Sequence, residues 1–348
     1  MFDFLERDTD CQRFEQLLST IKHDKCIAFT GAGLSKPLGY RVWEEGICGT
    51  DDDHPTLIQL AGVDNDKAKN KSLPDVIDEC KIILNEKYFE FLLNEFGRIN
   101  KAKHHPNLFS LWKSNYKHLI TTNFDASLYD NREDCENIVT YPSKELKIQP
   151  KRTLFYLHGR AFITNSEKAE TLNYWLENLV YGKLSYLEAY DPQNGDGAIG
   201  FFIYSIIQAF SILFIGFSMK DEDFKNTYKQ MKDRWDRYIR KINQHPQREK
   251  ESINGQYILY PYPLKSEYIS DKDYSHQVES FEYWEQLLNE INISVIAYKK
   301  MDKEEHKGLS LALEYIMDEA PFKNKVELSE LGIQAFDSGS ASINEVSR

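Results

Sequence analysis

Two clusters of polar residues hold the side chains best suited to chemistry, and each follows an apolar run. Asn123 and Asp125 follow the run 118–122. A carboxamide and a carboxylate two positions apart can bind ribose hydroxyls and hold a water, although an Asx turn explains them equally well. His158 follows the run 154–157, and an imidazole with a pKa near ~6.5 suits general-base work unless the histidine is structural.

Two further clusters are turns that follow apolar runs. The first comprises Gly31, Ala32, Gly33 and Ser35. Glycines let backbone N–H groups approach a phosphate, and the N-terminus of a following helix, which Ser35 is placed to cap, adds positive potential. Because Lys36 stands where a dinucleotide fingerprint has its third glycine, a plain strand–helix turn remains an alternative. The second turn comprises Gly216, Phe217 and Ser218, and it lacks the second glycine of a serine-hydrolase elbow.

Parallel strands must position these clusters. Short apolar runs suggest strands at residues 26–30, 118–123, 152–157, 212–216 and 293–298. Helical patterns separate the runs, which predicts an α/β fold with a Rossmann-like, doubly wound parallel sheet. Ligands of such sheets bind beyond the carboxyl ends of the strands, so the four clusters are expected to meet along one edge.

Other segments show how the chain is organised. Helical spacing over residues 73–96 lies within a predicted helical insertion at about 44–100. Residues 221–242 predict an exposed, charge-laced helix, whose surface is either simply solvated or a docking face. The uncharged segment 198–217 is long enough to span a membrane, but a buried helix at 201–209 followed by a buried strand at 211–217 is favoured.

Composition excludes several classes of protein. The net charge of −12 disfavours direct nucleic-acid binding, because phosphate backbones repel an acidic chain. Five widely spaced cysteines without a C-x-x-C pair fit neither a disulfide framework nor a paired-cysteine zinc site. The acidic N-terminus shows no signal-peptide pattern, so a soluble cytoplasmic protein without membrane association is expected.

In their order, the clusters resemble the sirtuin-type (SIR2) fold, and especially the SIR2-like NAD-hydrolysing domains of bacterial anti-phage defence. The segments that carry the resemblance are Gly31–Ser35, Thr121–Asp125, Leu157–Gly159, Phe214–Ser218 with Asp221, Tyr283 and Trp284 leading into 293–298, and Asp302 with 305–308. The resemblance implies one NAD-binding and catalytic domain over residues 1–320, and a C-terminal tail at 321–348. Sirtuin deacylases hold a zinc module with two cysteine pairs, which these cysteines cannot form, so no zinc module or other metal is expected.

The resemblance also implies a reaction, which is cleavage of the nicotinamide–ribose bond of the substrate NAD⁺ to nicotinamide and ADP-ribose, or a cyclised form. It assigns catalysis to Asn123, which would orient water and ribose, and His158, which would accept a proton. The residues assigned to NAD⁺ are Gly31, Ala32, Gly33 and Ser35 at the pyrophosphate, Asp125 at the ribose, and Gly216, Phe217 and Ser218 near adenosine. Arg41 stands where the family usually has a proline, so the nicotinamide contact is not assigned.

Two other functions stay open: an NAD-dependent protein deacylase or ADP-ribosyltransferase, and a non-catalytic module that senses NAD⁺ or ADP-ribose and controls assembly. An unregulated NADase would starve its host. We therefore expect gating by homo-oligomerisation or by a partner protein, such as an ATPase subunit or a phage-sensing component by family analogy.

Overall fold

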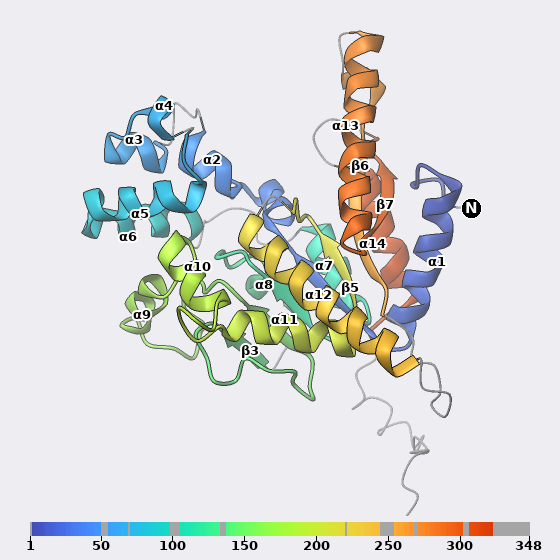
Figure 1. Cartoon of the computed structure of the whole chain (residues 1–348), viewed down its shortest axis with the longest axis horizontal. Helices are drawn as coiled ribbons and strands as arrows, with labels where there is room; N and C mark the ends of the chain where they lie inside the picture. The colour runs from blue at the N-terminus through green and yellow to red at the C-terminus, as the bar shows by residue number, and fades with distance from the viewer. Residues whose placement is uncertain are drawn as a thin grey trace, which may run out of the picture.

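The centre of the molecule is a sheet of seven parallel strands in the order β3-β4-β2-β1-β5-β6-β7 (Figure 1). The computed structural model describes residues 2–49, 55–68, 70–97, 105–132, 137–219, 221–243, 254–267, 270–301 and 306–322. The strands are β1 Cys26–Thr30, β2 Leu119–Thr121, β3 Asn137–Thr140, β4 Thr153–Tyr156, β5 Ser211–Ile215, β6 Gln256–Tyr262 and β7 Ser294–Lys299. The predicted Rossmann-like, doubly wound α/β fold is confirmed.

Helices cover both faces of this sheet. One face packs against α1 (Asp8–Lys22), α7 (Pro106–Lys113) and α14 (Lys307–Glu319). The other packs against α10 (Lys183–Tyr190), α11 (Ala198–Ala209), α12 (Glu222–Asn243) and α13 (Asp271–Glu290). In β1, Cys26 and Ala28 point to the first face while Ile27 and Phe29 point to the second, as strand alternation requires. Burial on both faces explains why β1 is continuously apolar.

Several helices lie between β1 and β2, in the stretch expected to form the helical insertion. They are α2 (Trp43–Cys48), α3 (Leu57–Ala61), α4 (Asn65–Ala68), α5 (Leu73–Leu84) and α6 (Glu86–Phe96), before α7. They share a third apolar core, to which Phe124 and Tyr181 contribute from outside the stretch. In Figure 1 these helices gather to one side of the sheet, where α5 packs against α10.

The apolar segment 198–217 divides as predicted into a buried helix, α11, and a buried strand, β5. Phe210 separates the two, in an extended conformation. None of the helices that the structure describes is long and apolar enough to cross a lipid bilayer.

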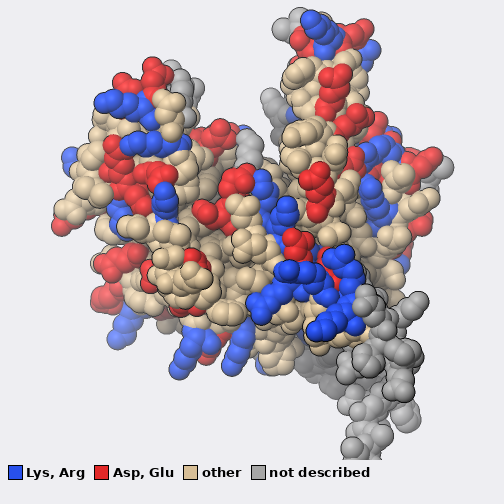
Figure 2. All heavy atoms as spheres, in the orientation of Figure 1, with Lys and Arg blue, Asp and Glu red and all other residues tan. Residues whose placement is uncertain are grey.

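Helix α12 departs from its prediction as an exposed helix. One face is buried against the sheet, and it includes Lys232, whose Nζ donates to Asp236 Oδ1 at 2.6 Å. The exposed face carries basic side chains over the C-terminal half of the helix (Figure 2); they belong to Arg234, Arg237, Arg240 and Lys241. The prediction therefore holds for one face of α12 only.

The edge strand β7 is covered by the first residues of the chain. Glu6 N donates to Ala297 O at 3.0 Å and Lys299 N donates to Phe4 O at 2.8 Å. Leu5 thus lies antiparallel to Tyr298. Most of the predicted tail, along with Asp302, Glu305 and Cys135, lies outside the described residues.

Candidate active site

The four predicted clusters follow β1, β2, β4 and β5, which are neighbours in the sheet. All four strands are parallel, so their carboxyl ends share one edge. After β1 the chain builds β2 and β4 on one side, and it later returns to build β5 on the other. A topological switch point therefore lies between β1 and β5, and open α/β sheets bind ligands in the crevice at such a point.

The glycine turn after β1 packs directly on the turn after β5. Gly31 N donates to Ile215 O at 3.0 Å, and Gly33 N donates to Gly216 O at 2.9 Å. A Cβ atom on Gly31 would lie 2.6 Å from Gly216 O, closer than Cβ contacts allow. Close packing between the two turns therefore requires glycine here, independently of any phosphate. Phe217 is buried at the same contact, Ala32 is half-buried and Ser218 is exposed.

The expected helix after the glycine turn is absent, and that prediction is wrong. Two short 3₁₀ turns follow instead, at Ala32–Leu34 and Lys36–Leu38, and Ser35 makes no side-chain cap. A macrodipole at this point thus cannot be invoked to bind pyrophosphate, because neither turn is an α-helix. Any anion would depend on backbone N–H groups alone.

Asn123 and Ser35 meet at the glycine turn. Asn123 Nδ2 donates to Ser35 Oγ at 3.0 Å, and Ser35 Oγ lies 2.9 Å from Ser127 Oγ. Asn123 is 8% exposed and Ser35 is buried. The carboxamide at the end of β2 is thus held against the turn after β1.

Asp125 supports this cluster from behind. Its Oδ1 accepts from the backbone N–H of Ser127 at 2.8 Å, at the start of α8 (Ser127–Asp130). Burial raises the pKa of Asp125, although hydrogen bonds from Ser127 and Ser35 oppose that rise. In this arrangement the carboxylate holds the backbone from Asp125 to Ser127, just after Asn123, in an Asx-type contact.

His158 is enclosed by aromatic side chains. It is 3% exposed, and its Nε2 is hydrogen-bonded to the Tyr190 hydroxyl at 2.6 Å. Its ring centroid lies 5.2 Å from that of Tyr186 and 6.5 Å from that of Phe124. Burial lowers the pKa of His158 to about 3, so the imidazole is neutral at physiological pH. A neutral imidazole is the form that can accept a proton, but a pKa of about 3 makes His158 a much weaker base than the value near ~6.5 on which the sequence expectation rests.

The structure brings Asn123 and Ser35 into contact, whereas His158 makes its hydrogen bond elsewhere. Asn123 and Ser35 touch directly, whereas His158 follows the adjacent strand β4 and contacts α10. The ring of Phe124, the residue after Asn123, lies 6.5 Å from the His158 ring between centroids.

Three residues that contact the predicted site residues were not predicted from the sequence. Ser127 had a usable signal, since an aspartate side chain commonly accepts from the backbone N–H two residues further on. Tyr190 and Tyr186 had no recognisable signal in the sequence, because only tertiary packing brings α10 to His158. Tyr186 also donates from its hydroxyl to Asp221 Oδ2 at 2.6 Å, and burial raises the pKa of Asp221 to about 6.

Arg41, which stands at the family's usual proline position, pairs with Glu95 of α6. Its charge is thus engaged inside the helical part of the molecule. Nearby, the Trp43 ring lies 5.9 Å from that of Tyr186, which places it at the edge of the aromatic enclosure of His158. Trp43 is therefore the residue of this segment that approaches the candidate site.

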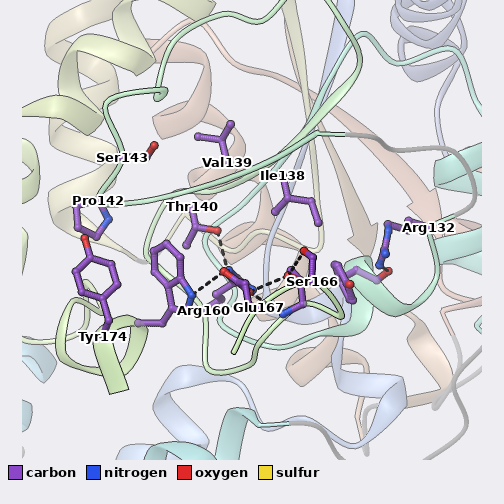
Figure 3. Close-up of a pocket in the computed structure, with 13 residues that line it drawn as sticks. Arg132, Ile138, Val139, Thr140, Pro142, Ser143, Arg160, Ser166, Glu167 and Tyr174 are labelled. Carbon is purple, nitrogen blue, oxygen red and sulfur yellow. Dashed lines mark hydrogen bonds and ion pairs between the residues drawn. The ribbon is translucent and has the colours of Figure 1, made fainter. Parts of the chain in front are cut away.

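A cavity of about 430 Å³ lies elsewhere, at the carboxyl end of β3 (Figure 3). None of the predicted site residues lines it. Among the described residues, no three His, Cys, Asp or Glu side chains are grouped to hold a metal ion, and Cys11, Cys26, Cys48 and Cys80 are free thiols.

Comparison with known families identifies a domain that contains three of the four clusters but not the glycine turn after β1. The family model for the SIR2-like domain matches residues 117–294, slightly more than half of the chain. The match includes β2, β4 and β5 with the clusters that follow them, and also Tyr190. No curated protein matches the chain. On this evidence the chain belongs to the SIR2-like domain family, whose members are in general NAD-dependent enzymes.

Proposed function

We propose that this protein is an NAD⁺ glycohydrolase, which cleaves the nicotinamide–ribose bond to give nicotinamide and ADP-ribose, in open or cyclised form. The observation that carries the proposal is the bond between Asn123 and Ser35, which sets a carboxamide against the glycine turn at the switch point of the sheet. Membership of an NAD-dependent family supplies the substrate class.

The chemistry of the nicotinamide–ribose bond determines which catalytic groups the site needs. Nicotinamide leaves as a neutral molecule, so this reaction needs no general acid, unlike ordinary glycoside hydrolysis. The site has to hold the ribose, stabilise the positive charge that develops on it and place a nucleophile. Neutral hydrogen-bonding groups and a base meet these needs.

Asn123 fits the positioning role. While its Nδ2 donates to Ser35, its amide oxygen can accept from a water or from a ribose hydroxyl. The bond to Ser35 fixes the plane of the carboxamide, so that its oxygen is oriented before substrate arrives.

His158 fits the role of proton acceptor once substrate reaches it. Burial keeps the imidazole neutral, and Tyr190 engages Nε2, so Nδ1 is the nitrogen left to accept a proton from a ribose hydroxyl. This role requires the tautomer in which Nε2 carries the proton and donates to Tyr190. As water attacks C1′ of the ribose, the bond from C1′ to nicotinamide breaks and nicotinamide leaves with the bonding electron pair. The water passes a proton to the ribose hydroxyl, which gives its own proton to Nδ1.

Enclosure of His158 supports gating. Because the ring is 3% exposed, substrate can reach it only when α10 or the adjoining segment moves. We propose that assembly into a homo-oligomer, or a partner such as an ATPase subunit or phage-sensing component, supplies that movement in anti-phage defence. In the closed form the host's NAD⁺ is spared.

The test is turnover of NAD⁺ by the purified protein over a range of protein concentrations, with products separated by chromatography. Asn123→Ala is compared with Asn289→Ala, which changes an exposed asparagine of α13. We expect nicotinamide and ADP-ribose from the wild type, a loss of about 100-fold or more in Asn123→Ala, and no change in the control.

Other outcomes select other functions. Full turnover by Asn123→Ala removes that residue from its role. Cleavage that strictly requires an added acylated peptide indicates a deacylase. Tight NAD⁺ binding without turnover in every assembly state indicates a sensing module.

A further inference from the structure

The cavity at the carboxyl end of β3 is formed by β3 and the chain after it, the chain after β4, the middle of α9 (Thr171–Glu177), and α8 with the chain just beyond it (Figure 3). Its volume of about 430 Å³ is at the small end of the range for ligand pockets, roughly 300–1,000 Å³. The side chains that line it are Tyr129, Arg132, Ile138, Val139, Thr140, Pro142, Ser143, Arg160, Thr164, Ser166, Glu167, Tyr174 and Trp175.

An ion pair fixes the middle of the cavity wall. Arg160 is 3% exposed, and it donates to Thr140 Oγ1 at 3.1 Å and pairs with Glu167. Glu167 also accepts from Thr164 N at 2.7 Å and from Trp175 Nε1 at 3.2 Å. Burial alone would raise the pKa of Glu167, but the hydrogen bonds from Arg160 and Thr164 lower it to about 2. The two charges cancel, and the wall is ordered without a ligand.

Arg132 supplies a second positive charge. Its guanidinium carbon lies 3.5 Å from the centroid of the Tyr129 ring, and Nη1 donates to Tyr129 O at 2.8 Å. No carboxylate within the described part of the chain pairs with this guanidinium. Its remaining N–H groups therefore suit an anion, and a guanidinium can bind phosphate through two of them.

The opposite end of the cavity is aromatic. In Figure 3, Tyr174 and Pro142 lie at one end and Arg132 at the other, with Arg160 and Glu167 between them. Tyr174 is 48% exposed, so much of its ring is open to a partner. An exposed tyrosine ring suits a planar heterocycle, because stacking on an aromatic face accepts any base.

We propose that this cavity binds a nucleoside monophosphate, with its base on Tyr174 and its phosphate on Arg132. The ring at one end, the cation at the other and the hydroxyl groups between them match the three parts of such a ligand. The small volume favours a mononucleotide over a dinucleotide. This site is distinct from the proposed NAD⁺-cleaving site, and its existence does not depend on that activity.

The cavity is close in sequence to the candidate active site, because both use residues of the turn after β4. Arg160 in its wall and His158 in the candidate active site flank Gly159, whose φ is +86°. Both side chains therefore emerge from one tight turn after β4, toward different sides.

AMP is the probe for the test, and binding to the full chain is measured by titration calorimetry, with adenosine and inorganic phosphate titrated separately. Arg132→Ala and Tyr174→Ala change the two ends of the cavity. Their matched controls are on α12, where exposed Arg237 also donates to a helix carbonyl, Asp233 O, and exposed Tyr238 also packs on a tryptophan, Trp235. Thermal melting of each variant establishes that it is folded.

We expect saturable binding of one AMP per chain, weakened about tenfold or more by Arg132→Ala and about threefold or more by Tyr174→Ala. Arg237→Ala and Tyr238→Ala leave the affinity unchanged. Adenosine and phosphate each bind more weakly than AMP, because each engages one end only.

Three results overturn the proposal. The first is the absence of saturable AMP binding up to about 1 mM. The second is AMP binding that both cavity variants leave unchanged, which places the nucleotide elsewhere. The third is phosphate binding as tight as AMP binding, which reduces the site to an anion site. NAD⁺ turnover, measured on the same preparations, reports separately on the proposed function.

Discussion

Asn123 and Ser35, 88 residues apart in the sequence, are joined by a hydrogen bond of 3.0 Å from Nδ2 to Oγ. The bond ties the end of β2 to the turn after β1, so the two strand ends cannot shift independently. Because Ser35 also contacts Ser127, the serine hydroxyl is the shared point of the cluster. A single buried hydroxyl therefore positions both the carboxamide and the turn proposed to hold the substrate.

Tyr190→Phe tests whether the phenol positions His158. The change removes the hydroxyl but keeps the ring stacked on Tyr186, where the centroids are 5.5 Å apart. We expect kcat for NAD⁺ cleavage to fall about ten- to a hundredfold, since the base loses its orientation, and the free energy of unfolding to fall by about 1 kcal/mol. Steady-state kinetics and urea denaturation measure these effects. Tyr283→Phe, at an exposed position of α13, is the control, and equal kcat values for the two variants would contradict the assignment.

Gly216→Ala tests the packing of the two turns. Gly216 has a φ of +62°, and an added Cβ would lie 2.6 Å from Leu34 N. We expect the free energy of unfolding to fall by about 3 kcal/mol or more, since backbone strain and a clash add. Gly62→Ala is the matched control: its φ is +65° but nothing lies within 4 Å, so strain alone costs about 1 kcal/mol. If denaturant titrations gave equal losses of unfolding free energy for the two variants, the contact between Gly216 and Leu34 would be able to relax around the added methyl group.

His118→Leu tests the effect of a buried histidine on acid stability. His118 is 1% exposed, and neither ring nitrogen has a hydrogen-bond partner among the described residues. Burial, aided by the charges of Lys117 and Arg152, lowers the pKa of His118 to about 4. The unfolded chain therefore binds a proton that the folded chain does not, so stability is full above pH ~6.5 and is lost as the pH falls toward about 4.

The expected loss at pH ~5 is about 2 kcal/mol for His118, with a similar loss for His158. Asp221 acts in the opposite direction, because its raised pKa lets the folded state bind a proton first as the pH falls through about 6. His118→Leu should therefore remove about half of the acid-induced loss of unfolding free energy that the two histidines cause. The melting temperature should then fall less steeply between pH ~7.5 and ~5. The exposed His276→Leu should keep the wild-type decline, and a decline of wild-type slope in His118→Leu would refute the assignment.

Lys232→Met tests the buried ion pair of α12. The change leaves Asp236 in the interior, where Asn292 Nδ2 still donates to its Oδ2 at 3.1 Å. We expect a loss of about 3–5 kcal/mol in the free energy of unfolding, most of which Lys232→Met combined with Asp236→Leu recovers. Lys225→Met breaks the exposed pair with Glu222 and should change stability by less than about 0.5 kcal/mol. A double variant no more stable than Lys232→Met would show that the pair contributes net stability.

The sequence predicted the central strands well because burial on both faces makes them continuously apolar. β6 was not predicted, and it contains Pro261, a residue type that argues against a strand interior. The structure accommodates it because β5 pairs with β6 only as far as Leu259, so Pro261 has a neighbour only on the β7 side, opposite Tyr298. The short strand β3, with its half-buried residues Asn137 and Ile138, gave no apolar run to detect.

For the candidate site, the sequence indicated which turns would meet, because parallel strands bring their carboxyl ends together. It could not indicate the partners of those turns. Tyr190 reaches His158 only through the packing of α10, and Arg41 is engaged by Glu95 only because α6 folds against it. Local spacing carries no information about such contacts.

The backbone pairing of Phe4 and Glu6 with the edge strand β7 has a consequence for variants that lack the N-terminal residues. Sheet borders with unpaired N–H and C=O groups recruit strands from other molecules. Deleting residues 2–6 would free the Lys299 amide and the Ala297 carbonyl, which these residues now occupy. Because Phe4 and Leu5 are also buried in the apolar core, aggregation of a shortened chain would report the loss of this strand pairing together with a loss of interior packing.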